Sequence, residues 1–203
     1  MIKDRQIPTK LKEPGYVRRV QWDDEQFKKL HTHFAAKPHG CLYRNNLAWE
    51  EYFRWDEDDT MVAIYYNEDD EPCGYMVYLI SSDVMHIKEL IYLYREAQLG
   101  LWEYIHAHDS LIDEVRGNNY YSEPIAFELD DSDIKETIRP YAMGRIIDVA
   151  QFISQYNCDP DGPGGCFSFE IADELLPWNN GTFVIDFEKG HCALTDKNPQ
   201  YHL

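Results

Sequence analysis

Acidic side chains follow and interrupt an aromatic stretch between residues 46 and 59, and this pattern could bind a small cation. Carboxylates concentrate positively charged ligands by electrostatic attraction. The residues that we select as a candidate pocket for such a ligand are Trp49, Glu50, Phe53 and Asp56. Three further carboxylates extend the acidic run, namely Glu51, Asp58 and Asp59. A solvated acidic face is the simpler interpretation of the same residues.

Histidines and cysteines supply the other side chains with metal-ligand chemistry. Two pairs of histidines stand two positions apart: His31 with His33, and His106 with His108. Residues two apart on a helix point in different directions, so we interpret these pairs as solvated or core histidines. A zinc site from a folded-back loop would need Cys158, Cys166, His191 and Cys192. Their spacing matches none of the usual zinc patterns, so we predict no metal site.

The charge balance of the chain excludes some functions and favours others. Its 203 residues include 19 Lys and Arg against 37 Asp and Glu, a formal net charge of -18. Binding of nucleic acid through phosphates needs a basic face, which this composition does not provide. An acidic surface would instead attract cationic substrates such as polyamines or aminosugars, although simple solubility is the alternative. We also expect no membrane partner, because apolar runs such as 76–80 are far too short to span a bilayer.

Cysteine usage and the start of the chain bear on its compartment. The five cysteines are an odd number and form no C-x-x-C pair, and no signal peptide opens the sequence. These features favour free thiols in a reducing environment. We therefore expect a cytoplasmic protein.

Apolar spacing predicts the elements that must position these residues. We expect helices over about 23–37, 46–56 and 96–109, a hairpin from 61–67 and 73–81, and a third strand over 85–93. Shorter strands are expected near 126–129 and 145–149, followed by a brief helix to 156. Residues 1–16 are polar and show little periodicity, so we interpret them as an extended lead-in that forms no core.

A sharp change of composition marks a domain boundary at residues 158–166. Two prolines and three glycines within nine residues cannot continue a helix or a central strand. Beyond this loop, residues 167–173, 182–190 and 191–195 alternate as strands do, and a tight turn at Lys189 and Gly190 joins the second pair. The boundary is therefore expected between residues 156 and 157.

The order of elements and three specific runs give the chain a resemblance to a known family. The runs are HGCLYRNNLAWEEYFRWD at 39–56, RPYAMGRIIDV at 139–149 and PWNNGTF at 177–183. They resemble the enhanced intracellular survival (Eis-like) family of GNAT N-acetyltransferases. This resemblance implies an α+β chain, in which a GNAT-like acyl-CoA N-acyltransferase domain with a mixed sheet precedes a partial sterol-carrier-like segment. The implied boundaries are a lead-in over 1–16, a central GNAT-like domain over 17–156 and the sterol-carrier-like start over 157–203.

The resemblance also points to one segment that should bind acetyl-CoA in an active domain. GNAT domains present a Q/R-x-x-G-x-G/A segment to the cofactor pyrophosphate at a helix N-terminus. The corresponding residues here are REAQLG, in which Arg95 and Gly100 fit but Gln98 replaces a glycine that lets the backbone approach the phosphates. The phosphate loop is degenerate, and an ordinary helix start is the alternative. We therefore expect no cofactor bound to this chain alone, and no catalytic residue within it.

These implications lead to one predicted function and two rivals. We expect the chain to be part of an enzyme that transfers acetyl from acetyl-CoA to aminoglycoside, polyamine or lysine amines. This part would be inactive alone and would serve structural, acceptor-pocket and homo-oligomer roles. The first rival is a stand-alone, non-catalytic binding or assembly module. The second is a small acetyltransferase with a divergent cofactor loop around Arg95.

Overall fold

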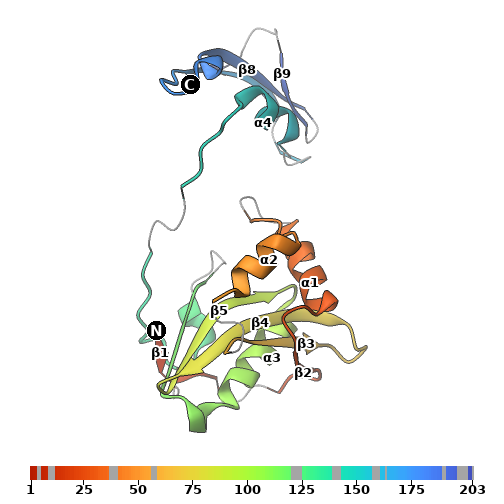
Figure 1. Ribbon diagram of the computed structural model, residues 1–203, viewed down its shortest axis with the longest axis vertical. Coiled ribbons are helices and arrows are strands. Elements are labelled where there is room, and N and C mark those ends of the chain that lie inside the picture. The colour runs from red at the N-terminus through yellow and green to blue at the C-terminus, as the bar shows by residue number, and fades with distance from the viewer. Residues whose placement is uncertain are drawn as a thin grey trace. The chain divides into compact units, whose positions relative to one another are not determined.

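The computed structural model divides the chain into two compact units, Met1–Thr137 and Ile138–Leu203. It describes residues 1–3, 6–8, 12–36, 41–55, 59–119, 125–138, 143–156, 161–162, 164–188, 191–195 and 201–202 (Figure 1). The units therefore divide between residues 137 and 138, whereas the sequence placed a boundary between 156 and 157. Each unit is described by itself below.

The first unit is built on a mixed sheet of six strands in the order β1-β6-β5-β4-β3-β2. The strands are β1 (Ile2–Lys3), β2 (Tyr16–Val20), β3 (Met61–Tyr66), β4 (Pro72–Ser81), β5 (Val84–Tyr92) and β6 (Glu114–Gly117). All neighbours are antiparallel except β5 and β6, which run parallel from Val84↔Glu114 to Ile87↔Gly117. The hairpin β3–β4 and the third strand β5 confirm the sequence prediction.

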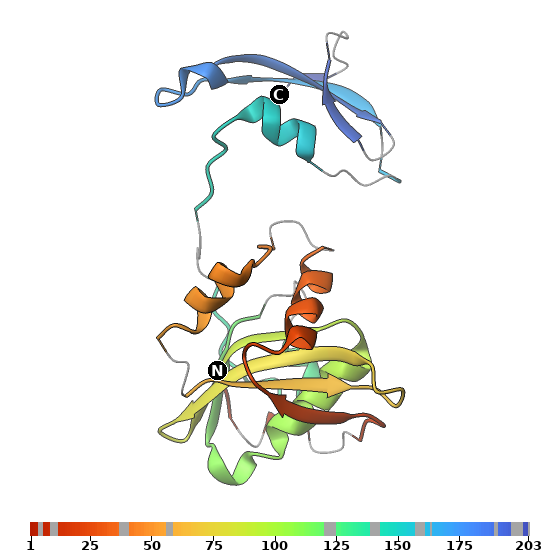
Figure 2. The same ribbon diagram turned by 45° about the vertical axis from the view of Figure 1, so that its right-hand side comes forward.

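Helices cover both faces of this sheet (Figures 1 and 2). One face carries α1 (Glu25–Ala35) and α2 (Asn46–Phe53), and the other carries α3 (Arg95–His106). The Asp24 carboxylate accepts from the amides of Gln26 and Phe27 and so caps α1, while the Asn45 side chain caps α2. These helices confirm the three predicted from apolar spacing.

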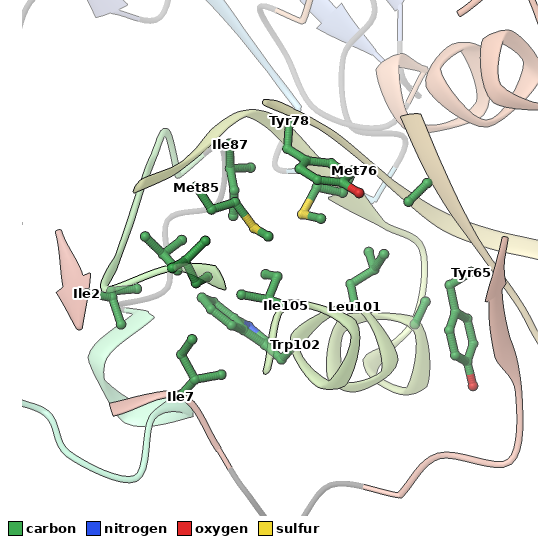
Figure 3. Close-up of a cluster of buried hydrophobic side chains, with 14 of the residues drawn as sticks. Ile2, Ile7, Tyr65, Met76, Tyr78, Met85, Ile87, Leu101, Trp102 and Ile105 are labelled. Carbon is green, nitrogen blue, oxygen red and sulfur yellow. The ribbon is translucent and has the colours of Figure 1, made fainter. Parts of the chain in front are cut away.

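Two hydrophobic cores result from this arrangement, one on each face. Met76 and Tyr78 of β4 pack with Leu101, Trp102 and Ile105 of α3 (Figure 3). The alternate β4 residues Tyr75 and Val77 pack with the aromatic side chains of α1 and α2 on the opposite face. A strand buried on both sides lacks the polar alternation of a half-exposed strand, which explains the continuous apolar run at residues 75–80.

The structure corrects several expectations for individual segments. The lead-in does contribute to a core, because Ile7 is fully buried and Ile2 is 6% exposed. The expected strand at 126–129 is a 3₁₀ turn, Ile125–Glu128, and no strand forms at 145–149. Short apolar runs do not distinguish strands from turns, and their conformation depends on what they pack against. The four-residue strand β6 was not predicted for the same reason.

The second unit pairs one short helix with a four-stranded sheet. Its elements are α4 (Val149–Gln155), β7 (Gly165–Ile171), β8 (Gly181–Glu188), β9 (His191–Leu194) and β10 (Tyr201–His202), with strand order β10-β7-β8-β9. Val149 and Ile153 of α4 pack on Ile185 of β8. The helix before the glycine-rich loop therefore belongs to this unit.

Side-chain hydrogen bonds and an ion pair connect the residues just before α4 to the loop that precedes β8. Asn179 is 2% exposed, accepts from the Val149 amide at 3.1 Å and donates to the Ile147 carbonyl at 3.1 Å. Arg145 forms an ion pair with Asp173. Two of the runs that carry the family resemblance, at 139–149 and 177–183, thus meet in the described part of this unit. Among the described residues, no helix is long and apolar enough to cross a membrane.

Candidate functional site

The start of α3 is the candidate cofactor site, and there the structure brings Arg95 and Gln98 together. Strand β5 ends at Tyr92 and α3 begins at Arg95. Arg95 donates from Nη1 to Gln98 Oε1 at 2.7 Å, and Gln98 donates from Nε2 to the Tyr92 hydroxyl at 3.1 Å. Gln98 is only 6% exposed. The side chain that replaces the expected glycine is therefore buried and ties the start of α3 to the end of β5.

The charges at this helix start do not favour an anion. Arg95 is paired with the Glu128 carboxylate, and the Glu96 carboxylate lies in the first turn and accepts from the Tyr65 hydroxyl at 2.7 Å. The start of α3 thus holds one guanidinium and two carboxylates. A carboxylate in the first turn already complements the positive end of the helix dipole, which is the feature that would otherwise attract a phosphate.

Gly100 lies one turn further along α3 and has a packing role. A Cβ at this position would come within 2.1 Å of Cε2 in the Tyr65 ring. The glycine therefore lets α3 approach β3 closely. Burial of Tyr65, and then its hydrogen bond to Glu96, raise the pKa of this hydroxyl well above its ordinary value, so it remains a donor.

Of the four residues selected as an amine pocket, two lie in the core and one on the surface of α2. Trp49 and Phe53 are 2% and 1% exposed and pack into the core beneath α1 and α2. Phe27 of α1 contacts Trp49 with ring centroids 4.7 Å apart. Glu50 is exposed on α2, away from these two rings, and Asp56 lies outside the described residues.

A buried ion pair, missed from the sequence, lies beside these aromatic residues. Arg44 donates from Nη1 and Nη2 to the two carboxylate oxygens of Glu89, at 2.8 and 2.9 Å. The guanidinium also stacks over the rings of Trp49 and Tyr52, at 4.6 and 4.5 Å from their centroids. Burial alone would lower the pKa of Arg44, but its hydrogen bonds to Glu89 outweigh burial and raise it.

Two more side chains complete this network. The Tyr75 hydroxyl lies 2.8 Å from Glu89 Oε2 and 2.9 Å from His31 Nδ1. His31 Nε2 lies 3.1 Å from the Leu42 carbonyl, which can only accept, so the imidazole hydrogen is placed on Nε2. Burial, together with the Arg44 charge, lowers the pKa of His31. The ring is therefore neutral at neutral pH.

This network holds the fold together rather than offering a base for catalysis. Both oxygens of Glu89 accept from Arg44, and Glu89 is 2% exposed. Both carboxylate oxygens are therefore committed to charge-assisted bonds within the core. A sequence signal existed, since Glu89 stands between Ile87 and Ile91 in the alternating buried positions of β5, and a buried carboxylate requires a partner.

Among the described residues, no group of three or more metal-ligand side chains gathers. His31 is buried while His33 is exposed, as expected for residues two apart on a helix. Cys158 lies outside the described residues, and so do the side chains of His191 and Cys192.

The sequence matches two family models. Residues 40–146, more than half of the chain, match the acetyltransferase (GNAT) domain, and residues 149–202 match the sterol carrier protein domain. The mixed sheet flanked by helices is the fold of the first, and the sterol-carrier-like unit follows it. The chain belongs to the acetyltransferase (GNAT) domain family.

Several solved structures resemble the whole chain. A conserved protein of unknown function from Enterococcus faecalis V583, described as a probable N-acyltransferase, is 25% identical with a TM-score of 0.83, over 97% of this chain and 51% of that one. A GCN5-related N-acetyltransferase from Anabaena variabilis is 21% identical with a TM-score of 0.80, over 97% and 52%. Eis1 from Mycobacterium abscessus is 17% identical with a TM-score of 0.64, over 100% and 53%. The chain spans about half the length of these proteins, and no curated protein matches it.

Proposed function

We propose that this chain is the central, non-catalytic GNAT domain, with the start of the sterol-carrier-like domain, of an Eis-like N-acetyltransferase. Such an enzyme transfers acetyl from acetyl-CoA to an amine. The family match and the likeness of fold to proteins about twice as long support this assignment. The domain's own work is to brace a catalytic domain, to help shape the acceptor pocket and to provide subunit contacts.

The occupied first turn of α3 is the observation that carries the non-catalytic role. A pyrophosphate needs backbone N–H groups that it can reach and a positive local field. Here the buried Gln98 side chain is bonded to Tyr92 and Arg95, Glu96 adds negative charge, and Arg95 is already paired with Glu128. An incoming pyrophosphate would have to displace Gln98 and compete with two carboxylates.

One observation supports the rival of a divergent cofactor loop. The Arg95 side chain is 57% exposed, so its guanidinium can be reached from solvent. A phosphate could therefore take the place of Glu128, whose own side chain is 15% exposed. The two hypotheses differ in whether this chain binds acetyl-CoA.

Calorimetric titration of acetyl-CoA into the purified chain separates the two hypotheses, with the intact mass checked on the same sample. We expect no saturable heat. Micromolar binding that Arg95→Ala abolishes would replace our proposal with the divergent loop. The matched control is Arg116→Ala, which removes a similarly exposed arginine that is paired with Glu114.

The acceptor and the assembly state are further parts of the proposal. The net charge of -18 supports a cationic amine acceptor, in the class of aminoglycosides, polyamines or lysine side chains. Measurement of acetyl transfer to each class by the full-length parent, and of its molar mass by light scattering, tests the acceptor and the expected homo-oligomer. Faster transfer to neutral amines would contradict the electrostatic argument.

A further inference from the structure

A cluster of hydrogen-bond donors lies at the other end of α3, beside the edge strand β2. Arg19 of β2 donates from Nε to the Tyr104 hydroxyl at 2.8 Å, and its Nη2 lies 3.1 Å from His108 Nε2. The hydroxyls of Tyr104 and Tyr78 lie 2.7 Å apart. Four side chains from β2, β4, α3 and the residues just after α3 therefore converge.

The imidazole of His108 is held in one tautomer within this cluster. Its Nδ1 lies 2.8 Å from the Tyr104 carbonyl, which can only accept, so Nδ1 carries the hydrogen. Its Nε2 then accepts from Arg19. The ring is 7% exposed and contacts the rings of Tyr78 and Tyr104 edge-on. His108 therefore positions Arg19 but has no hydrogen left to donate.

The cluster holds more hydrogens than acceptors. Tyr78 and Tyr104 bring two hydroxyl hydrogens, of which only one can lie between their oxygens. Arg19 can only donate, and its bonds to Tyr104 and His108, with its contact to the Tyr78 hydroxyl, use at most three of its five N–H groups. Burial, and then the bond to Tyr104, raise the pKa of Tyr78, so its hydroxyl keeps its hydrogen.

Arg19 also lacks a carboxylate partner within the part of the chain that the structure describes. None of the ion pairs there includes it. This is notable in a chain where acidic residues outnumber basic ones by 37 to 19. The C-terminal carbonyls of α3 do not need Arg19 either, because those of Glu103, Tyr104 and Ile105 already accept from Ala107 or His108.

We propose that Arg19 and the hydroxyl of Tyr104, which the fully buried Tyr78 hydroxyl holds in place, bind an oxyanion, either a carboxylate or a phosphate group. The guanidinium provides a planar fork that fits such a group, and the hydroxyl hydrogen without an acceptor adds a further donor. Arg19 is exposed on the edge strand, so the site is open to solvent. It lies about 13 Å along α3 from Arg95, taking about 1.5 Å per residue, so it is separate from the candidate cofactor site.

The test follows the imidazole resonances of His108 in the full chain by NMR during titration with inorganic phosphate and, separately, with acetate. Sodium chloride at matched ionic strength corrects for screening. We expect a saturable shift with at least one of the two anions. Saturation by phosphate alone identifies a phosphate site, and saturation by acetate alone a carboxylate site.

Two variants and one control make this test specific. Arg19→Gln should weaken the anion affinity at least tenfold, and Tyr104→Phe should weaken it without loss of the Arg19 charge. Arg18→Gln is the matched control, because Arg18 is the exposed neighbour on β2 and donates instead to the Tyr66 hydroxyl. The proposal is overturned if neither anion saturates, if Arg19→Gln binds as wild type does, or if Arg18→Gln weakens binding equally.

Discussion

Removal of one partner from the Arg44–Glu89 pair should destabilise the first unit strongly. Glu89 is 2% exposed and Arg44 16%, so Glu89→Gln leaves a largely buried guanidinium without its counter-charge. Breaking such a pair costs about 3–5 kcal/mol. Because Arg44 keeps its contacts with Trp49 and Tyr52 and some access to water, we take the lower end, about 3 kcal/mol.

Removal of the cation instead of the carboxylate should lower the stability of the first unit at least as much. Arg44→Met retains an apolar side chain against the aromatic rings but leaves the Glu89 carboxylate buried without a cation. The double variant removes both charges, and replacement of a whole buried pair by neutral groups is often nearly neutral. We therefore expect the double variant to lose well under the sum of the two single losses, with a coupling energy above about 1.5 kcal/mol.

Urea unfolding followed by tryptophan fluorescence measures these losses. Trp22, Trp49, Trp55 and Trp102 lie in the first unit, so the signal reports mainly on that unit. The control is Glu50→Gln, an exposed change on α2 that should stay within about 0.5 kcal/mol of wild type. A loss below about 1 kcal/mol for Glu89→Gln, or strictly additive single losses, would refute the reasoning.

Three further outcomes follow from the described contacts. The lowered pKa of His31 means that the unfolded chain binds the proton first as pH falls through about 6.5, so the urea midpoint should fall between pH 7.5 and 5.5, and less so in His31→Gln. Gly100→Ala should lower the melting temperature by overpacking against Tyr65, at a cost of about 1–3 kcal/mol, whereas Gly144→Ala, with nothing within 4 Å, should not. Asp173 is partly desolvated, which raises its pKa, but hydrogen bonds from Asn179, two backbone amides and Arg145 lower it overall to about 2. The second unit should therefore lose stability from about pH 4 downward, and Asp173→Asn should weaken this dependence, as followed by NMR of its strand amides.

Local patterns in the sequence were enough to predict much of the first unit. The spacing of apolar residues depends only on neighbours along the chain, so these helices and the β3–β4 hairpin were predicted. The weakest predictions were for short segments. The turn at Ile125–Glu128 was predicted as a strand, and the buried lead-in residues Ile2 and Ile7 were predicted outside the core.

The candidate sites could be predicted less well, because their chemistry depends on residues far apart in sequence. Arg44 and Glu89 are 45 positions apart, and Arg19 and His108 are 89 apart. Apolar spacing carries no information about which polar groups will meet across a sheet. Three of the residues selected for an amine pocket, Trp49, Glu50 and Phe53, are neighbours on α2, and helix geometry alone separates Trp49 from Glu50.

By itself, the sequence determined the α+β class, the main helices and strands, and the relation to acetyltransferases, because these follow from periodicity and from runs of adjacent residues. Only the tertiary structure decided what the degenerate loop does. The Gln98 side chain could have pointed into solvent, but it bonds to Tyr92 and Arg95, and Arg95 is paired with Glu128. The physical reason is that a side chain's partners are set by the packing of α3 against the sheet, which no local pattern specifies.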